Sequence, residues 1–92
     1  MFGFLNRGSS VATEEVFARL QRRVPHLLSE ATGETRVSRL PLDSMDVVEL
    51  LCATEDEFGV GLTTAEFMRA RTVNDLLRTI ARRATKAGHA LR

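Results

Sequence analysis

The apolar residues of this 92-residue chain recur at the spacing of one helix face. The clearest run lies near the C-terminus and matches the i, i+3, i+4, i+7, i+8, i+11 pattern without a miss: Val73, Leu76, Leu77, Ile80, Ala81 and Ala84. No segment alternates apolar and polar residues as a half-buried strand does, and Tyr and Trp are absent. The chain is therefore predicted to be all-α.

The first predicted helix begins at Thr13 and ends before Gly33. Pro25 interrupts its apolar pattern, because proline lacks the backbone N–H and disfavours helical geometry in the preceding residue. We expect one kinked helix or two abutting ones, followed by a long loop over residues 33 to 42. The loop is expected to be pinned to the core by its apolar residues, Val37, Leu40 and Leu42.

Asp43 is the predicted N-cap of the second helix, with Asp46 at its third position and Ser44 in its first turn. Gly59 and Gly61 are expected to end this helix. Two further capping boxes open a short third helix and a long fourth one, at Thr63 with Glu66 and at Thr72 with Asp75. The fold class predicted is a four-helix bundle.

A chain of this length forms a single domain, for which we predict residues 11–87, between a flexible tail (1–10) and a loose end (88–92) that starts where Gly88 stops the last helix. It has no apolar run long enough to cross a bilayer. A lone Cys52 excludes an internal disulfide, and the two histidines add no zinc-binding spacing, so no metal is expected. The cysteine usage predicts a reducing, cytoplasmic setting. We also expect the protein to be a monomer.

The net charge of +1 conceals a strong segregation of charge. Residues 43 to 68 hold seven acidic and no basic residues, whereas the preceding and following segments carry +2 and +6. This asymmetry fits an acidic surface for a basic partner, a basic tail for an acidic partner, or simply a solvated face.

The second predicted helix has two opposed stripes. The core-facing stripe consists of Val47, Leu50, Leu51, Thr54 and Phe58. The opposite stripe consists of Met45, Glu49, Cys52 and Asp56. A face that mixes a methionine and a thiol with carboxylates indicates a docking surface with an apolar centre and an acidic rim.

Patterns typical of catalysis are missing from the sequence. Neither His26 nor His89 has a serine, cysteine or carboxylate at a spacing that suggests a triad, and no glycine-rich loop follows a strand. We therefore predict that the protein is not an enzyme. Nucleic acid is not an expected partner either, because the basic residues lack interleaved aromatics and the acidic helix would repel phosphates.

Residues 40 to 50 read Leu-Pro-Leu-Asp-Ser-Met-Asp-Val-Val-Glu-Leu, and residues 55 to 58 read Glu-Asp-Glu-Phe. This pattern resembles the acyl carrier protein family, whose members have Gly-x-Asp-Ser-Leu at the start of the second helix, then Val-Glu-Leu and an acidic stretch ending in Phe. Landmarks at residues 34–37, 61–62 and 72–76 extend the resemblance over roughly residues 13 to 86.

The resemblance implies that Ser44 is esterified by 4'-phosphopantetheine from coenzyme A, whose thiol carries acyl groups as thioesters in fatty-acid, polyketide or related metabolism. A serine in a first helical turn is exposed, and unpaired amides there favour a phosphate. Without the surrounding pattern, Ser44 would be an ordinary first-turn residue beside a cap.

The resemblance also implies partners and a pocket. A phosphopantetheinyl transferase and acyl synthases or transferases would present Arg and Lys to the predicted docking residues: Asp43, Met45, Asp46, Glu49, Cys52 and Asp56. The implied acyl pocket consists of Leu50, Leu51, Leu62, Phe67 and Leu76.

Two departures imply a specialised member of the family. Pro41 stands where the family usually has glycine, which restricts the backbone just before Ser44 and implies less easy recognition by a generic transferase. The last helix is basic, whereas housekeeping carriers are acidic throughout. A peptidyl or aminoacyl carrier, which shares the Asp-Ser motif, and a non-modified helical interaction module remain the alternatives.

Overall fold

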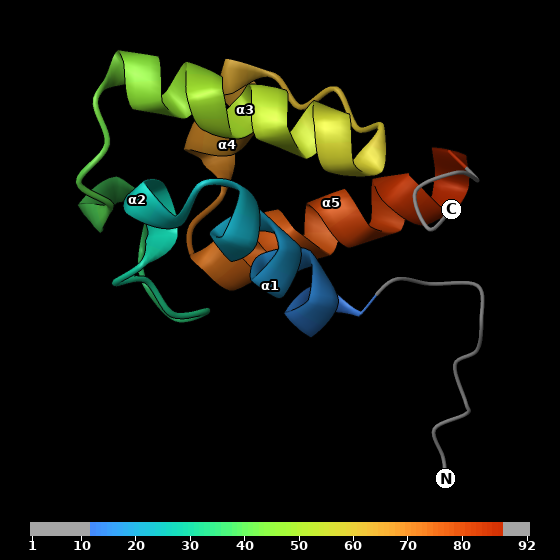
Figure 1. Cartoon of the computed structure of the whole chain (residues 1–92), viewed down its shortest axis with the longest axis horizontal. Helices are drawn as coiled ribbons and strands as arrows, with labels where there is room; N and C mark the ends of the chain where they lie inside the picture. Colours follow the sequence, from blue (N-terminus) through green and yellow to red (C-terminus); the bar gives the residue numbers. More distant parts are fainter. Residues whose placement is uncertain (1–11, 88–92) are drawn as a thin grey trace, which may run out of the picture.

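A computed structural model describes residues 12–87 of the chain. The helices of this part, in chain order, are α1 (Thr13–Arg23), α2 (Pro25–Leu28), the 3-10 turn η2 (Val37–Arg39), α3 (Ser44–Phe58), α4 (Thr64–Arg69) and α5 (Val73–Ala87) (Figure 1). No β-strand occurs in these residues, so the all-α prediction is confirmed. The predicted tail of residues 1–10, the loose end and the stop at Gly88 lie outside the described residues.

The first predicted helix is divided in two at Pro25. Of the two expectations, a kinked helix or two abutting helices, the second is confirmed. Pro25 is the first residue of α2, and Val24 before it has left helical geometry with φ of −133°. With α1 and α2 counted as its two halves, all four predicted helices are present. The halves pack against each other because Val24, Leu27 and Leu28 are buried in the common core.

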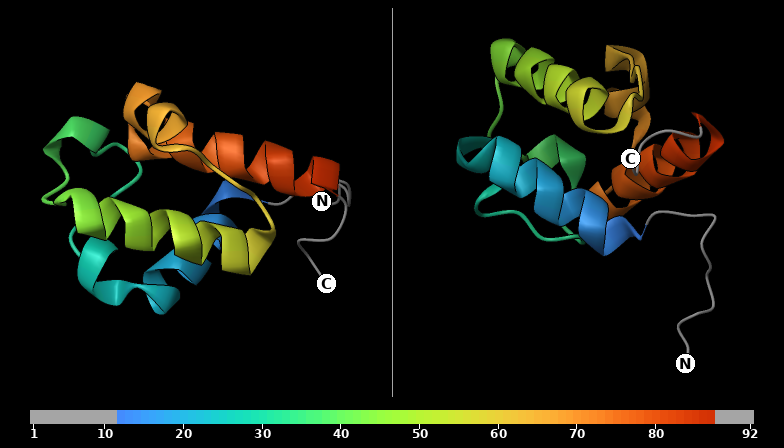
Figure 2. Two further views of the ribbon diagram at one scale, coloured as in Figure 1. Left: turned by 90° about the horizontal axis from the view of Figure 1, so that it is seen from above. Right: turned by 45° about the vertical axis from the view of Figure 1, so that its right-hand side comes forward.

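The long helices α1, α3 and α5 surround one apolar core, with α3 above α1 and α5 in Figure 1 and α4 behind α3 (Figures 1 and 2). Its most completely buried side chains are Phe58, Leu20, Ile80, Val16 and Thr54. The Thr54 hydroxyl donates to the Leu50 carbonyl at 2.9 Å, which satisfies a polar group inside the core. Ala53 is buried, whereas the predicted core residue Leu51 is only half-buried.

The predicted starts of α3 and α4 are confirmed, as is the predicted end of α3 at Gly59. Asp43 and Asp46 form a reciprocal capping box at the start of α3, and the same arrangement joins Thr63 to Glu66 before α4. Gly59 ends α3 with φ of 69°, in the left-handed region that glycine enters without steric cost.

The loop after α2 is tied to the start of α5 by backbone hydrogen bonds. These run from Val37 N to Arg71 O (2.9 Å), from Val73 N to Thr35 O (2.9 Å) and from Asn74 N to Gly33 O (2.8 Å). A Cβ at Gly33 would lie 2.4 Å from the Asn74 side-chain oxygen, so a larger residue there would require the Asn74 side chain to move. Val37 is buried, and Leu40 and Leu42 pack partly buried against the core, which confirms that the loop is pinned.

Candidate functional site

Ser44 is the first residue of α3, and its side chain is exposed. The capping box fixes the backbone on both sides of it: Asp43 accepts from the Asp46 amide at 2.9 Å, and Asp46 accepts from the Asp43 amide at 3.2 Å. The amides of Ser44 and Met45 have no protein acceptor in the described part of the chain. A phosphate on the Ser44 hydroxyl would therefore find two free N–H donors and the positive end of the helix dipole.

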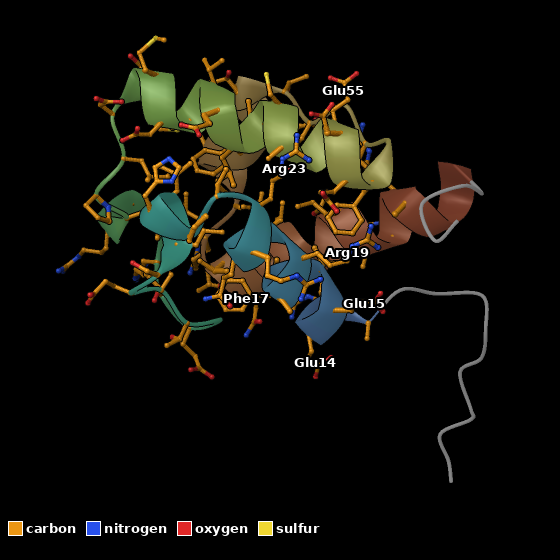
Figure 3. All side chains as sticks on the ribbon, in the orientation of Figure 1. Glu14, Glu15, Phe17, Arg19, Arg23 and Glu55 are labelled. Atoms are coloured by element: carbon orange, nitrogen blue, oxygen red, sulfur yellow. The ribbon has the colours of Figure 1, made fainter. Side chains whose placement is uncertain are left out.

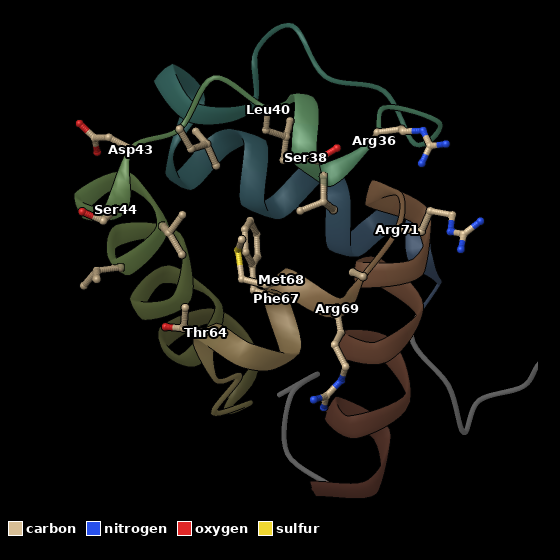
Figure 4. A pocket seen from close by; sticks show the side chains of 15 residues that line it. Arg36, Ser38, Leu40, Asp43, Ser44, Thr64, Phe67, Met68, Arg69 and Arg71 are labelled. Carbon is tan, nitrogen blue, oxygen red and sulfur yellow. The ribbon is translucent and has the colours of Figure 1, made fainter.

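A hollow of about 870 Å³ opens beside Ser44, between the N-terminal half of α3, the η2 segment and α4 (Figure 4). Its apolar wall consists of Val37, Leu40, Leu42, Val47, Val48, Phe67, Met68 and Ala70. Its polar wall consists of Arg36, Ser38, Asp43, Ser44, Thr64, Arg69 and Arg71. Ser44 thus lies at the edge of a largely apolar cavity.

The hollow does not coincide with the implied acyl pocket. Of the five residues in that set, Phe67 lines the hollow. The other four do not line it, because they lie on faces turned toward the core: Leu50, Leu62 and Leu76 are buried there and Leu51 is half-buried against it. The loop residues Leu40 and Leu42, which the sequence identified only as anchors, are part of the wall.

Four of the six predicted docking residues lie along the outer face of α3, whereas Asp43 precedes the helix as its N-cap and Asp46 is half-buried in its first turn. Met45 is 72% exposed, and Glu49, Cys52 and Asp56 are exposed on the same face. Val48, which is 50% exposed, extends the apolar part of this surface toward the hollow and was not in the predicted set. The face therefore combines carboxylates with accessible apolar side chains.

Each predicted docking carboxylate also has a partner within the chain. Asp43 and Asp46 cap α3, Glu49 contacts the His26 ring at 3.1 Å, and Asp56 pairs with Arg23. The sequence alone did not indicate the last two contacts, because their partners are 23 and 33 positions away. These exposed pairs are weak and solvent-screened, so a cation from another protein can share the carboxylates.

The C-terminal end of α3 is joined to α1 by two arginines (Figure 3). Arg19 and Arg23 reach the two carboxylate oxygens of Glu57 at 3.1 and 3.0 Å. The Arg19 guanidinium also lies 4.9 Å from the centre of the Phe58 ring, within cation–π range. The hydrogen bonds to Asp56 and then to Glu57 raise the pKa of Arg23 above its ordinary value.

Glu66 links α4 to α5. The backbone N–H of Thr63 and the Arg83 guanidinium, in that order, hold the pKa of its carboxyl below the ordinary value. Arg83 spans Glu66 at 2.9 Å and the Gly61 carbonyl at 3.2 Å. The backbone N–H of Thr72 has the main part in lowering the pKa of Asp75, which also pairs with Arg78.

Comparison with known proteins decides the family. The family described as the phosphopantetheine attachment site matches residues 15–80. The acyl carrier protein of Thermotoga maritima is 31% identical over 75 residues, which cover 76% of this chain and 93% of that protein. This chain belongs to the acyl carrier protein family.

Two chloroplastic acyl carrier proteins of Cuphea lanceolata are also similar to this carrier. Acyl carrier protein 4 is 33% identical over 92 residues and covers 95% of this chain. Acyl carrier protein 1 is 34% identical over 61 residues and covers 66% of it. The carrier spans 66% and 44% of the lengths of these two relatives.

The prosthetic group of this carrier is 4'-phosphopantetheine, as the matched attachment-site family describes, so the family and cofactor predictions are confirmed. The exposed Ser44 hydroxyl and the two free amides beside it fit a phosphodiester at the start of α3. Within residues 12–87 no helix of the carrier is long and apolar enough to cross a membrane, and no group of three or more His, Cys, Asp or Glu could hold a metal ion.

Proposed function

We propose that this protein carries acyl groups as thioesters on a 4'-phosphopantetheine arm attached to Ser44, in fatty-acid, polyketide or related acyl metabolism. The observation that carries the proposal is the position of Ser44, exposed at the capped start of α3 and at the edge of an apolar hollow. The arm supplies the thiol that holds the acyl group. The chain's own residues position that arm and provide no catalytic group.

The residues around Ser44 have separate tasks in this proposal. Asp43 and Asp46 fix the first turn of α3, so that the hydroxyl is presented in one backbone geometry. The amides of Ser44 and Met45 stabilise the negative phosphate. The apolar wall of the hollow, with Phe67 at its inner side, excludes water from the carried group.

The partners proposed are a phosphopantetheinyl transferase and acyl-handling enzymes with basic docking surfaces. Their Arg and Lys side chains would approach the carboxylates of α3, while Met45 and Cys52 provide the apolar centre. Electrostatic attraction of this kind accelerates encounter without long residence, which suits a carrier that visits several enzymes. We further propose that the carrier is a cytoplasmic monomer, although the two Cuphea relatives are named as chloroplastic.

The test is modification by coenzyme A with two transferases of different specificity, because we propose that Pro41, which stands where the family usually has glycine, limits which transferase fits. The wild type should gain the mass of one phosphopantetheinyl group, and Ser44→Ala should gain none. Ser38→Ala is the matched control. Ser38 is also exposed and lines the same hollow, but it lies in the 3-10 turn η2 and not at the start of an α-helix. An adduct that persists in Ser44→Ala, or a wild type that neither transferase modifies, would contradict the proposal.

A further inference from the structure

Four exposed arginines gather around the end of α4 and the first half of α5, and we call them the arginine patch: Arg36, Arg69, Arg71 and Arg82. In Figure 4 the side chains of the first three point outward, away from the hollow beside Ser44. Within residues 12–87 no ion pair involves any of the four. By contrast, the arginines that join one helix to another are paired with carboxylates: Arg19, Arg23 and Arg83.

The fold holds the arginine patch together. Arg36 and Thr72 form an isolated antiparallel β-bridge, and the amide of the residue after Arg36 donates to the Arg71 carbonyl at 2.9 Å. Arg69 is the last residue of α4, two positions before Arg71. Together with Arg82 these two line a depression of about 480 Å³ between α4 and α5. Positive charges fixed close together raise the local potential, which attracts a negatively charged group.

Two carboxylates lie in the same depression, but other groups already bind them. Glu66 is held by its capping contacts at the start of α4 and by Arg83. Asp75 is held by the backbone amide at the start of α5 and by Arg78. Neither carboxylate forms an ion pair with the arginine patch, so the patch keeps its capacity for carboxylates from another molecule.

The surroundings of the patch favour a protein as that molecule over a nucleic acid or a lipid surface. Glu66 and Asp75 stand among the arginines, so a continuous row or layer of phosphates would meet negative as well as positive charge. Separate carboxylates on a protein can approach the arginines and avoid these two. Met68, which is 66% exposed, directly precedes Arg69 and provides an apolar contact. Arginine and methionine are both enriched in protein interfaces.

We infer that the arginine patch is a second docking surface, which binds a partner protein that presents Asp and Glu side chains beside an apolar contact for Met68. Its charge is opposite to that of the proposed docking face on α3. A partner that binds both surfaces needs basic and acidic residues in one fixed arrangement. The patch would thus distinguish such a partner from enzymes that accept any acidic carrier.

The inference goes beyond the proposed function and does not require an arm on Ser44, so its test uses the unmodified carrier. The probes are two hexapeptides, Asp-Glu-Leu-Leu-Glu-Asp and its amide counterpart Asn-Gln-Leu-Leu-Gln-Asn. Each is titrated at low salt into the isotope-labelled carrier, while the backbone N–H and arginine Nε–H signals are followed by NMR.

Two variants with the same change in net charge are compared. Arg71→Glu reverses one charge within the patch. Arg22→Glu is the matched control, because Arg22 is exposed on α1, forms no ion pair in the described residues and lines neither the hollow nor the depression. Only the position of the reversed charge differs between the two variants.

The acidic peptide should shift the signals of the arginine patch and of Met68, and the amide peptide should not. Arg71→Glu should weaken binding of the acidic peptide about fivefold, because it removes one exposed ion pair and adds repulsion. Arg22→Glu should bind the peptide nearly as the wild type does. Added salt should weaken binding to the wild type, since exposed charges are screened.

Equal weakening by Arg71→Glu and Arg22→Glu would overturn the inference, because it would show a response to net charge alone. Patch signals that respond to phosphatidylglycerol vesicles or duplex DNA but not to the acidic peptide would overturn it and assign the patch to a lipid surface or a nucleic acid. Salt-sensitive self-association that Arg71→Glu abolishes would make a second copy of the carrier the occupant instead. Failure of modification at Ser44 is a separate result, since none of these measurements uses the arm.

Discussion

The two ends of α3 differ in how their charges are used. At the C-terminal end, Arg19 and Arg23 from α1 are paired with Glu57 above a completely buried Phe58. At the N-terminal end, Ser44 faces a hollow whose far wall holds three arginines without carboxylate partners in the described residues. We call these the closed end and the open end.

The difference shows how one small domain separates stability from binding. The closed end combines a fully buried aromatic ring with neutralised charges, so its interactions are satisfied within the chain. The open end leaves apolar surface and positive charge accessible to a ligand or a partner. Changes at the two ends should therefore affect different measurements.

The largest expected effect on stability is at the closed end. Phe58→Ala should lower the free energy of unfolding by about 3 to 5 kcal/mol, because it leaves a cavity in a close-packed core. Phe67→Ala should cost clearly less, since Phe67 already borders the hollow and its truncation enlarges an existing space. Urea denaturation of the two variants measures both losses, and equal losses would show that the ends are packed alike.

The next effect concerns the rate of modification. A Glu49→Lys, Asp56→Lys double variant should slow the transferase about tenfold at low salt, because it reverses the charge that steers encounter. The slowing should diminish as salt rises, since charges are screened over about 8 Å at physiological ionic strength.

Arg82→Gln is the control for this comparison, because Arg82 is exposed on α5 and has no ion pair in the described residues. Its modification rate should stay near that of the wild type. A slow Arg82→Gln together with a normal α3 variant would place transferase docking on the basic helix.

A smaller effect on stability is expected when acid protonates the carboxylate of Glu66, which lies in α4 beside the open end. Because its folded-state pKa is lowered, its contribution to stability is fully present above the ordinary glutamate pKa of about 4.3 and is lost as the pH falls through the lower folded value. Glu66→Gln should therefore melt below the wild type at pH 7 and lose less on acidification, so that the two curves converge.

Melting temperatures measured between pH 7 and pH 3 check this expectation. Glu30→Gln is the control, because Glu30 is exposed and forms no ion pair within residues 12–87. If the melting temperature of Glu66→Gln stayed at a constant difference from that of the wild type at every pH, the Thr63 and Arg83 contacts of the Glu66 carboxylate would not stabilise the folded state.

The smallest effect on stability is expected at Glu49, which lies on α3 between the two ends. Glu49→Gln should change the free energy of unfolding by no more than about 0.5 kcal/mol, because its contact with His26 is exposed. Thermal melts of this variant beside Phe58→Ala compare the two faces of α3 directly. A loss for Glu49→Gln as large as that for Phe58→Ala would contradict the assignment of the faces.

The helix boundaries were predictable because their signals are local. Pro25, the Asp43 cap and Gly59 each act on neighbouring backbone groups, and each lies where the sequence placed a boundary. The exposed face of α3 was equally predictable, since it follows from the helical period alone.

The hollow and the closed end were not predictable in the same way. Arg19 and Glu57 are 38 positions apart, and nothing in the helical period indicates which charges will meet across the bundle. The acyl pocket was implied by the family resemblance and stays a prediction. Periodicity identified Leu50 and Leu76 as buried but could not distinguish the packed core from the wall of a cavity.

The backbone tie between the loop after α2 and the start of α5 has a topological consequence. Because Val37 and Arg71 are hydrogen-bonded, the chain enters and leaves the segment of residues 38–70 at one place. That segment contains Ser44, α3 and α4, so the proposed modification site and the proposed docking face lie in one stretch of chain whose two ends are hydrogen-bonded to each other. A chimaera that exchanges residues 38–70 between carriers would transplant both together, through two junctions that the recipient already holds side by side.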